Sequence, residues 1–452
     1  MEFLCDPPRF KLFCSAPSSM CLAKRMLVRP LLRTRPVVLS LPSRRVLMSR
    51  FLAHIIALGF AAASAAAQQQ PRARDLGIPF DGTPGPLNAI TDVAGVEVGH
   101  VTLISGSGPV LPGKGPVRTG VTAILPRGRR VNDAVFGGWF TLNGNGEMTG
   151  TTWVEESGFL EGPVLITNTH NVGVVRDAAA EWMISKGYNV EVFALPVVAE
   201  TFDVLNDVNG FHVRREHALA ALDSAKPGPV REGAVGGGTG MICHGFKGGI
   251  GTSSRRVGDH AIGVLVQCNY GSTWQLRIAG IPVGREITGT AMCIEGNQRP
   301  SRQWVAEWIT RRCDQPAPGG APENRDEDRG SIIVVIATDA PLLPHQLKRI
   351  ATRATLGIAR MGGVGGNSSG DIFIAFSTAN RGARQSARAR VEMLANDAMT
   401  ALFEATAQAT EEAIVNALIA GRTMTGADNL RVYGLPHDQV VNVLRKHQRL
   451  RQ

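Results

Sequence analysis

Apolar and polar residues are arranged along this chain in a way that predicts a layered protein of strands and helices. Between 342 and 361, apolar residues recur every three or four positions, which is typical of a helix with one buried face. Short apolar runs at 261–269, 331–337 and 372–376 are bounded by glycine and polar residues and predict buried strands. This mixture favours a layered α/β or α+β fold.

The remaining expected elements are shorter or less regular, and none of them forms an internal repeat. They are strands at 119–125, 163–167, 189–198 and 275–281, a strand pair around a glycine turn within 90–101, helices at 174–186 and 216–225, and helical sequence over 387–420 with a break near 406–410. Together these elements predict a single domain over 68–452.

Residues 1–67 have the pattern of a leader. Arg50 precedes an apolar run, 51–67, that ends in small residues, and this combination predicts a secretory signal peptide. The run is shorter than the about 20 residues that a membrane span needs, although a retained anchor remains an alternative. Met48 is the expected start of translation. We therefore expect an exported protein, periplasmic or secreted, with no stable membrane span after processing.

Charge and composition narrow the classes of function. The net charge of +10 comes mostly from the leader, where ten Lys or Arg residues face two acidic residues, so that the body is nearly neutral. A nearly neutral body argues against a nucleic-acid partner. With 44% hydrophobic and 19% charged residues, the chain can supply a large core.

Four cysteines lie outside the leader, without a C-x-x-C pair. They are Cys243, Cys268, Cys293 and Cys313. In an exported protein they could form one or two bridges, or they could be plain buried thiols. Because so large a core does not need disulfides, we predict buried thiols.

The most informative segment is the glycine-rich loop 365–371, GGNSSGD, which joins the predicted helix to a predicted strand. Cleavage of the chain before one of its serines would leave a residue with both a hydroxyl and a free amine, the equipment of an N-terminal nucleophile. The loop also contains G-x-S-x-G, but a nucleophile elbow needs a strand before the serine and a helix after it. Here that order is reversed. A loop without chemistry remains open on this evidence.

Other motifs do not indicate a cofactor or a metal. The glycine run 235–240 lacks the lysine of a phosphate-binding loop and the spacing of a dinucleotide site. The histidines show no H-E-x-x-H or similar ligand spacing. We expect neither cofactors nor metals.

Several segments resemble the DmpA family, which comprises L-aminopeptidase/D-esterase/amidases and β-peptidyl aminopeptidases. The segments are 82–89, 137–139, 167–173, 243–252, 338–347, 366–373 and 411–418, and the likeness extends over about 77–440. The resemblance implies an αββα sandwich, shaped like N-terminal-nucleophile hydrolases but with different strand connectivity. It also implies that the precursor cuts itself before a nucleophilic serine, and that processed pairs assemble into a homo-oligomer.

Carried onto this chain, the resemblance makes Ser369 the nucleophile and Ser368–Ser369 the bond that is cut. The predicted pieces are 68–368 and 369–452. A second cleavage, between Asn367 and Ser368, remains an alternative because this chain has two adjacent serines.

The resemblance further implies a hydroxyl and a carboxylate, two residues apart on a helix start, that assist the nucleophile. The alignment assigns these roles to Thr410 and Glu412, with threonine in place of the family's serine. The same residues could instead simply begin a helix, with Thr410 as its N-cap.

An oxyanion hole and an ammonium site complete the expected machinery. The family's oxyanion tyrosine matches Tyr270, and Asn269 could assist from the same turn. An aminopeptidase must also hold the substrate's ammonium group with a carboxylate, for which Glu147 is the candidate. Asp371 could fix the new N-terminus. Tyr270 at a strand end and Glu147 in a loop could equally be solvated without function.

The predicted function is therefore that of an exported, self-processing serine aminopeptidase. It would release N-terminal residues from peptides, amides or esters through an acyl-enzyme. One alternative is an acyltransferase of the ornithine-acetyltransferase type, which typically uses threonine. Another is a non-catalytic exported binding protein.

Overall fold

The structure is a computed structural model that describes residues 71–130, 132–188, 193–317 and 330–451, all within one compact unit, 70–452. The predicted leader lies outside these residues. The strands are β1 Glu97–Ser105, β2 Val117–Leu125, β3 Val135–Gly144, β4 Phe159–Leu160, β5 Val164–Asn168, β6 Val197–Thr201, β7 Ile242–Cys243, β8 Phe246–Lys247, β9 Gly249–Val257, β10 His260–Asn269, β11 Cys293–Ile294, β12 Ser331–Thr338, β13 Gly370–Ser377, β14 Met424–Thr425 and β15 Leu430–Val432. The α-helices are α2 Thr151–Ser157, α3 Val172–Ser185, α4 Arg215–Asp223, α5 Gln303–Trp308, α6 Pro344–Arg360, α7 Thr400–Ile419 and α8 His437–Lys446.

Two main sheets carry most of the strands. One has the order β1-β2-β5-β6, and the other has the order β4-β3-β13-β12-β10-β9. In the larger sheet β12 and β13 run parallel, joined by α6, while their outer neighbours are antiparallel to them. In the smaller sheet only β5 and β6 run parallel, joined through α3.

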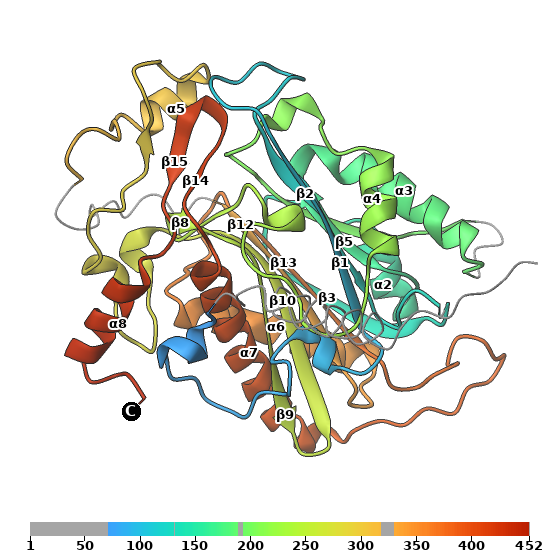
Figure 1. Cartoon of the computed structure of the whole chain (residues 1–452). Coiled ribbons are helices and arrows are strands. Elements are labelled where there is room, and N and C mark those ends of the chain that lie inside the picture. The colour runs from blue at the N-terminus through green and yellow to red at the C-terminus, as the bar shows by residue number, and fades with distance from the viewer. Residues whose placement is uncertain (1–70, 131, 189–192, 318–329, 452) are drawn as a thin grey trace, which may run out of the picture. The chain divides into compact units, whose positions relative to one another are not determined.

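Helices cover the outer face of each sheet, so that the unit has four layers (Figure 1). Alternate residues of β12 show why: Ile332 and Val334 pack toward α6 and α7, whereas Ile333 and Val335 pack between the two sheets. A third apolar cluster lies between the smaller sheet and helices α3 and α4. Both faces of β12 are therefore buried, as expected for an unbroken apolar run. The predicted αββα arrangement is what the structure has.

Helix α6 has the apolar stripe that the sequence predicted, and it begins with Pro344 at a position where a missing N–H costs nothing. Helix α7 differs from the prediction, since it runs unbroken through 406–410. It packs so closely on β9 that a Cβ on Gly251 would lie 2.0 Å from the carbonyl oxygen of Ala413. Tertiary packing of this kind keeps the threonine-rich middle of α7 helical.

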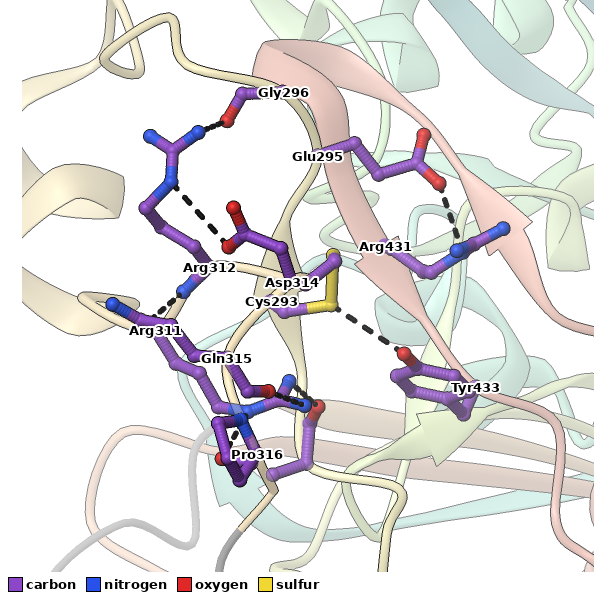
Figure 2. Close-up of a disulfide and its surroundings, with 12 residues drawn as sticks. Cys293, Glu295, Gly296, Arg311, Arg312, Asp314, Gln315, Pro316, Arg431 and Tyr433 are labelled. Carbon is purple, nitrogen blue, oxygen red and sulfur yellow. Dashed lines mark hydrogen bonds and ion pairs between the residues drawn. A yellow bond between two sulfur atoms is a disulfide. The ribbon is translucent and has the colours of Figure 1, made fainter.

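The prediction of buried thiols is wrong, because the four cysteines form two disulfides. Cys243 is bonded to Cys268, and Cys293 is bonded to Cys313. Figure 2 shows the second bridge near charged residues, among them Glu295, Arg312 and Arg431. The hydroxyl of Tyr433 lies 3.6 Å from the sulfur of Cys293. Sequence spacing could not reveal either pair, since pairing depends on where the fold brings each Cβ.

Three shorter predictions also need correction. Within 90–101 only β1 is a strand; residues Ile90–Asp92 form a 3-10 turn, because Asp92 accepts hydrogen bonds from the backbone of Leu87 and Ala89. The expected strand at 275–281 is reduced to one bridge between Ile278 and Ile281. Of the strand expected at 189–198, residues 189–192 lie outside the described residues, and β6 begins only at Val197.

Candidate active site

Four neighbouring strands of the larger sheet bring a row of small and polar residues to one end of the sheet. Asn269 of β10 is paired with Ser331 of β12, Ser331 is paired with Gly370 of β13, and Gly370 is paired with Gly144 of β3. Directly paired residues point to the same face of a sheet. Ser331 shares its face with Ile333, which packs between the two sheets, so Asn269 and Ser331 also face the smaller sheet.

Two serines lie at this end of the sheet. Ser331 opens β12, and its Oγ accepts a 3.0 Å hydrogen bond from the N–H of Gly370. Ser369 lies one residue before β13, and its hydroxyl donates a 2.6 Å hydrogen bond to Asp371. Ser331, Ser369 and Asp371 are all buried, with Ser369 and Asp371 only 1% exposed. The site therefore offers two hydroxyls and one carboxylate.

The end of β3 and the loop that follows hold the serine loop from its other side. Asn145 donates from its backbone to the carbonyl of Ser369 and from its side chain to the exposed Ser368, at 3.3 and 2.8 Å. The side chain of Asn143 donates to Asp371 at 3.2 Å. Because α6 precedes this loop and β13 follows it, the nucleophile-elbow interpretation is excluded.

A buried carboxylate that sequence reasoning missed lies beside the serines. Glu200 of β6 is 3% exposed; it accepts hydrogen bonds from the backbone N–H of Glu147, at 3.0 Å, and from the hydroxyl of Thr169. A Cβ on Gly146 would lie 3.2 Å from Glu200 Oε1 and also 3.2 Å from the Cα of Gly370. Burial raises the pKa of Glu200 above its ordinary value, against the opposing effect of the Thr169 hydrogen bond.

Glu147 itself is exposed, although it belongs to the same loop. Its backbone reaches the site, while its side chain does not share the burial of Glu200. The burial of Glu200 is set by strand β6 and by the loop that packs against it.

Asn269 and Tyr270 lie next to each other just at and after the end of β10. The side-chain oxygen of Asn269 accepts a 2.8 Å hydrogen bond from the N–H of Ile242. Tyr270 is 2% exposed and belongs to the apolar cluster between the larger sheet and its helices, with its ring 4.8 Å from that of His244. Of the two, Asn269 is the residue that pairs with Ser331 in the sheet.

The structure does not bring Thr410 and Glu412 to this row. Thr410 lies in the middle of α7, where its hydroxyl donates to the carbonyl of Thr406 at 2.8 Å, so it is not an N-cap. Glu412 is fully buried and binds Arg74 through two 2.7 Å contacts and Arg255 through a third, with Asn88 at 2.6 Å.

The sheet register fixes how far away this ion cluster is. Arg255 of β9 is paired with Ile262, and Ile262 is paired with Thr338, the last residue of β12. Ser331 is the first residue of the same strand of eight residues, and at about 3.3 Å per residue the two ends are roughly 23 Å apart. Glu412 therefore lies near the opposite end of the sheet from both serines.

Comparison with known proteins identifies the family. The model of peptidase family S58 matches residues 88–432. The chain belongs to peptidase family S58. It is 53% identical to the β-peptidyl aminopeptidase BapA of Sphingosinicella microcystinivorans, over 87% of this chain and 97% of that protein.

Solved structures agree with this assignment. The L-aminopeptidase D-Ala-esterase/amidase of Ochrobactrum anthropi, a serine aminopeptidase with a variant of the Ntn-hydrolase fold, is 45% identical with a TM-score of 0.72, over 84% of this chain and all of that one. A β-aminopeptidase of Burkholderia sp. is 45% identical with a TM-score of 0.69, covering 83% and 99%.

Family membership makes this protein an aminopeptidase, and it confirms the predicted family, fold class and enzyme class. The S58 match supports the aminopeptidase over the two alternatives, an acyltransferase and a non-catalytic binding protein. Among the described residues, no three His, Cys, Asp or Glu side chains are grouped so as to hold a metal ion.

Two residues of the site escaped the sequence analysis, Ser331 and Glu200. Ser331 was included in a predicted strand, and the signal that could have marked it is its position: a serine after a glycine, at the first residue of that strand and directly after a polar loop. Glu200 interrupts an apolar strand, and a charged residue within a buried run is itself a sign of function.

Proposed function

We propose that this S58 aminopeptidase is a self-processing enzyme whose nucleophile is Ser331, with Ser369 and Asp371 as its supporting pair. On the sequence alone, Ser369 was the expected nucleophile. The observation that carries the revised proposal is the 3.0 Å hydrogen bond from the N–H of Gly370 to Ser331 Oγ, next to the 2.6 Å hydrogen bond between Ser369 and Asp371.

Position in the strand supports Ser331 over Ser369. An N-terminal nucleophile must be the first residue of its fragment, and Ser331 is the first residue of a central strand, whereas Ser369 precedes β13. Gly330, just before it, has φ +124°, and a Cβ there would lie 1.9 Å from the carbonyl oxygen of Asn269, so only glycine fits. The peptide bond between Gly330 and Ser331 is thus close to Asn269, one of the candidate site residues.

The implied helper pair supports the same choice. The family resemblance implies a hydroxyl and a carboxylate two residues apart, downstream of the nucleophile. Ser369 and Asp371 have this spacing and contact each other, with aspartate in place of glutamate. Thr410 and Glu412 have the spacing too, but Glu412 is held by two arginines far along the sheet.

Processing would begin when Ser331 Oγ attacks the carbonyl carbon of Gly330. As the new O–C bond forms and the C–N bond breaks, the proton of the hydroxyl passes to the nitrogen of Ser331, so that an ester and a free amine remain. Water then hydrolyses that ester, which releases Gly330 as a carboxylate and restores the hydroxyl. The new α-amine has an ordinary pKa of about 7.7–8.0, so it can act as a base near neutral pH.

In turnover, the same hydroxyl would attack the first peptide carbonyl of a substrate, and water would resolve the acyl-enzyme. The side-chain N–H of Asn269, which the strand register pairs with Ser331, is the first candidate to donate to the oxyanion, and Tyr270 remains a second candidate. The buried carboxylate of Glu200 suits the substrate's ammonium group better than the exposed Glu147 does. Two of the named relatives are a β-peptidyl aminopeptidase and a β-aminopeptidase, so we propose N-terminal β-residues among the substrates.

N-terminal sequencing of the small fragment tests the cleavage directly. A start of Ser-Ile-Ile-Val supports Ser331. A start of Ser-Gly-Asp would restore Ser369, and Ser-Ser-Gly would indicate a cut before Ser368. In addition, Ser331→Ala should remain one uncut chain and should release no p-nitroaniline from β-alanyl or L-alanyl p-nitroanilide. Ser369→Ala should still be cut and active, but with lower rates of self-cleavage and of p-nitroaniline release.

We also propose that the enzyme is exported and active as an oligomer of processed pairs. The signal-like leader and two disulfides support export, because disulfides persist in oxidising compartments. Within the described residues, no helix is both long and apolar enough to cross a bilayer. Fractionation of cells that express the full chain tests export, and light scattering of the purified enzyme tests assembly; cytosolic or monomeric active protein would contradict the respective proposal.

A further inference from the structure

A short hairpin lies against the end of β10, where the candidate oxyanion donor Asn269 sits. The hairpin consists of β7 and β8, Ile242–Lys247, and it is tied to β10 by the Cys243–Cys268 disulfide. Both sulfurs belong to fully buried residues. The bridge therefore joins the hairpin to the residue that immediately precedes Asn269.

The hairpin also sets the orientation of the Asn269 side chain. The N–H of Ile242 donates to Asn269 Oδ1 at 2.8 Å. Since a side-chain amide has an acceptor at one end and a donor group at the other, fixing the oxygen on Ile242 directs the NH2 group elsewhere. The pairing of Asn269 with Ser331 puts that donor group on the face that carries the serine.

Further hydrogen bonds close the hairpin over the residues after β10. The N–H of His244 donates to the carbonyl of Tyr270 at 2.7 Å, and the hydroxyl of Thr273 donates to the carbonyl of His244 at 2.9 Å. His244 has φ +48°, an unusual conformation for a residue with a side chain, and is fully buried. Such a conformation persists only where its surroundings hold it.

We propose that the Cys243–Cys268 bridge and the Ile242 N–H form a clasp, residues 242–244 against 268–270, that positions Asn269 as an oxyanion donor. The proposal rests on the proposed function, and it assigns the bridge a positioning role in addition to a structural one. A donor held in place before reaction stabilises charge that develops in the transition state more than it stabilises bound substrate. Loss of the clasp should therefore lower kcat and leave KM almost unchanged.

The second disulfide provides a matched control. The variant with Cys243→Ala and Cys268→Ala should process and fold, but its kcat on β-alanyl p-nitroanilide should fall at least about tenfold, with KM within about twofold, because loss of a whole oxyanion donor costs about 10²–10³ in kcat. The variant with Cys293→Ala and Cys313→Ala, whose bridge is shown in Figure 2, should keep kcat within about twofold. Rates are taken per processed chain, with folding checked by thermal unfolding.

A double-mutant cycle separates positioning from general loosening. Asn269→Asp keeps an acceptor for the Ile242 N–H but lacks the donor group, so it should lose kcat while the melting temperature stays close to that of the parent. If the bridge acts through Asn269, removing it in the Asn269→Asp background should lower kcat by less than about twofold further. Additive losses, or an unchanged kcat without the bridge, would overturn the clasp.

The outcome also distinguishes the clasp from the function on which it rests. If the parent enzyme releases no p-nitroaniline, the proposed function fails before the clasp is reached. If the parent is active but the two double-cysteine variants lose kcat equally, only the clasp fails.

Discussion

The hydroxyl of Ser369 donates a 2.6 Å hydrogen bond to the carboxylate of Asp371, and both residues are almost fully buried. They flank Gly370, whose N–H is bound to Ser331 Oγ. One short turn thus supplies a carboxylate and a hydroxyl that bind each other, and between them a backbone donor that binds a second serine. Such a group can move a proton near Ser331, the proposed nucleophile.

Asp371→Asn should therefore lower both self-cleavage and turnover. The amide keeps the size of the carboxylate but loses its charge, so it holds the Ser369 hydroxyl less strongly. We expect kcat to fall about 10²–10⁴-fold, the usual range for positioned proton transfer, with KM little changed. Asp339→Asn, at the other end of β12 and partly exposed, serves as a control and should keep kcat within about twofold. Full activity of Asp371→Asn would contradict the supporting role.

Glu200→Gln should weaken the binding of substrates that carry an N-terminal ammonium group. A hydrogen bond to a charged group contributes about 1.5–3 kcal/mol, which corresponds to roughly a 10–150-fold increase in KM. Glu147→Gln is the matched control, because its side chain is exposed, and its KM should stay within about twofold. Steady-state kinetics on β-alanyl p-nitroanilide measures both. A large effect at Glu147 alone would reassign the ammonium site to that residue.

Glu412→Gln should destabilise the fold. Its carboxylate is fully buried between Arg74 and Arg255, and breaking a buried ion pair from one side costs about 3–5 kcal/mol. Glu411→Gln removes only a partly exposed pair with Arg360 and should cost less than about 1 kcal/mol. Denaturant unfolding of inactive Ser331→Ala protein gives both values without interference from processing. Equal losses would argue against the buried cluster as a structural element.

The same cluster predicts a dependence of stability on pH. Burial alone would raise the pKa of Glu412, but the hydrogen bond from Arg74 and the charges of Arg255 and Arg74 outweigh it, so the pKa lies below its ordinary value of 4.5. A depressed carboxyl pKa stabilises the fold above the unfolded value and ceases to do so as the pH falls through the folded value. Below about pH 4.5 the unfolding free energy should fall, and less steeply in Glu412→Gln. Parallel curves for both proteins would contradict this assignment.

Thr410→Val should leave catalysis intact. The Thr410 hydroxyl is bound to the carbonyl of Thr406 within α7, and valine preserves the shape of the side chain. We expect kcat within about twofold of the parent value and stability within about 1 kcal/mol. A loss of kcat near 100-fold with normal folding would instead return Thr410 to the catalytic machinery.

Much of the fold could be predicted because it depends on local patterns. The stripe of apolar residues over α6 and the unbroken runs of β12 and β13 indicate which surfaces are buried, whatever the rest of the chain does. The family resemblance added the αββα arrangement, which three apolar clusters and the two main sheets now explain. The sequence predicted a break in α7 near 406–410, but the helix is continuous. Threonines are weak helix formers, and close packing on β9 overrides that preference.

By itself, the sequence determined the family, the class of enzyme and the glycine loop that carries part of the site. Only the tertiary structure decided which groups meet there. Strand pairing brings Ser331 close to Asn269 and to the segment that carries Ser369, although these residues are far apart in the chain. Glu412, an expected partner of the nucleophile, instead binds arginines near the other end of the sheet. The sequence specifies the chemistry of each side chain, but which side chains lie close together depends on the register in which the strands pair. That register is set by the whole sheet and not by any one segment.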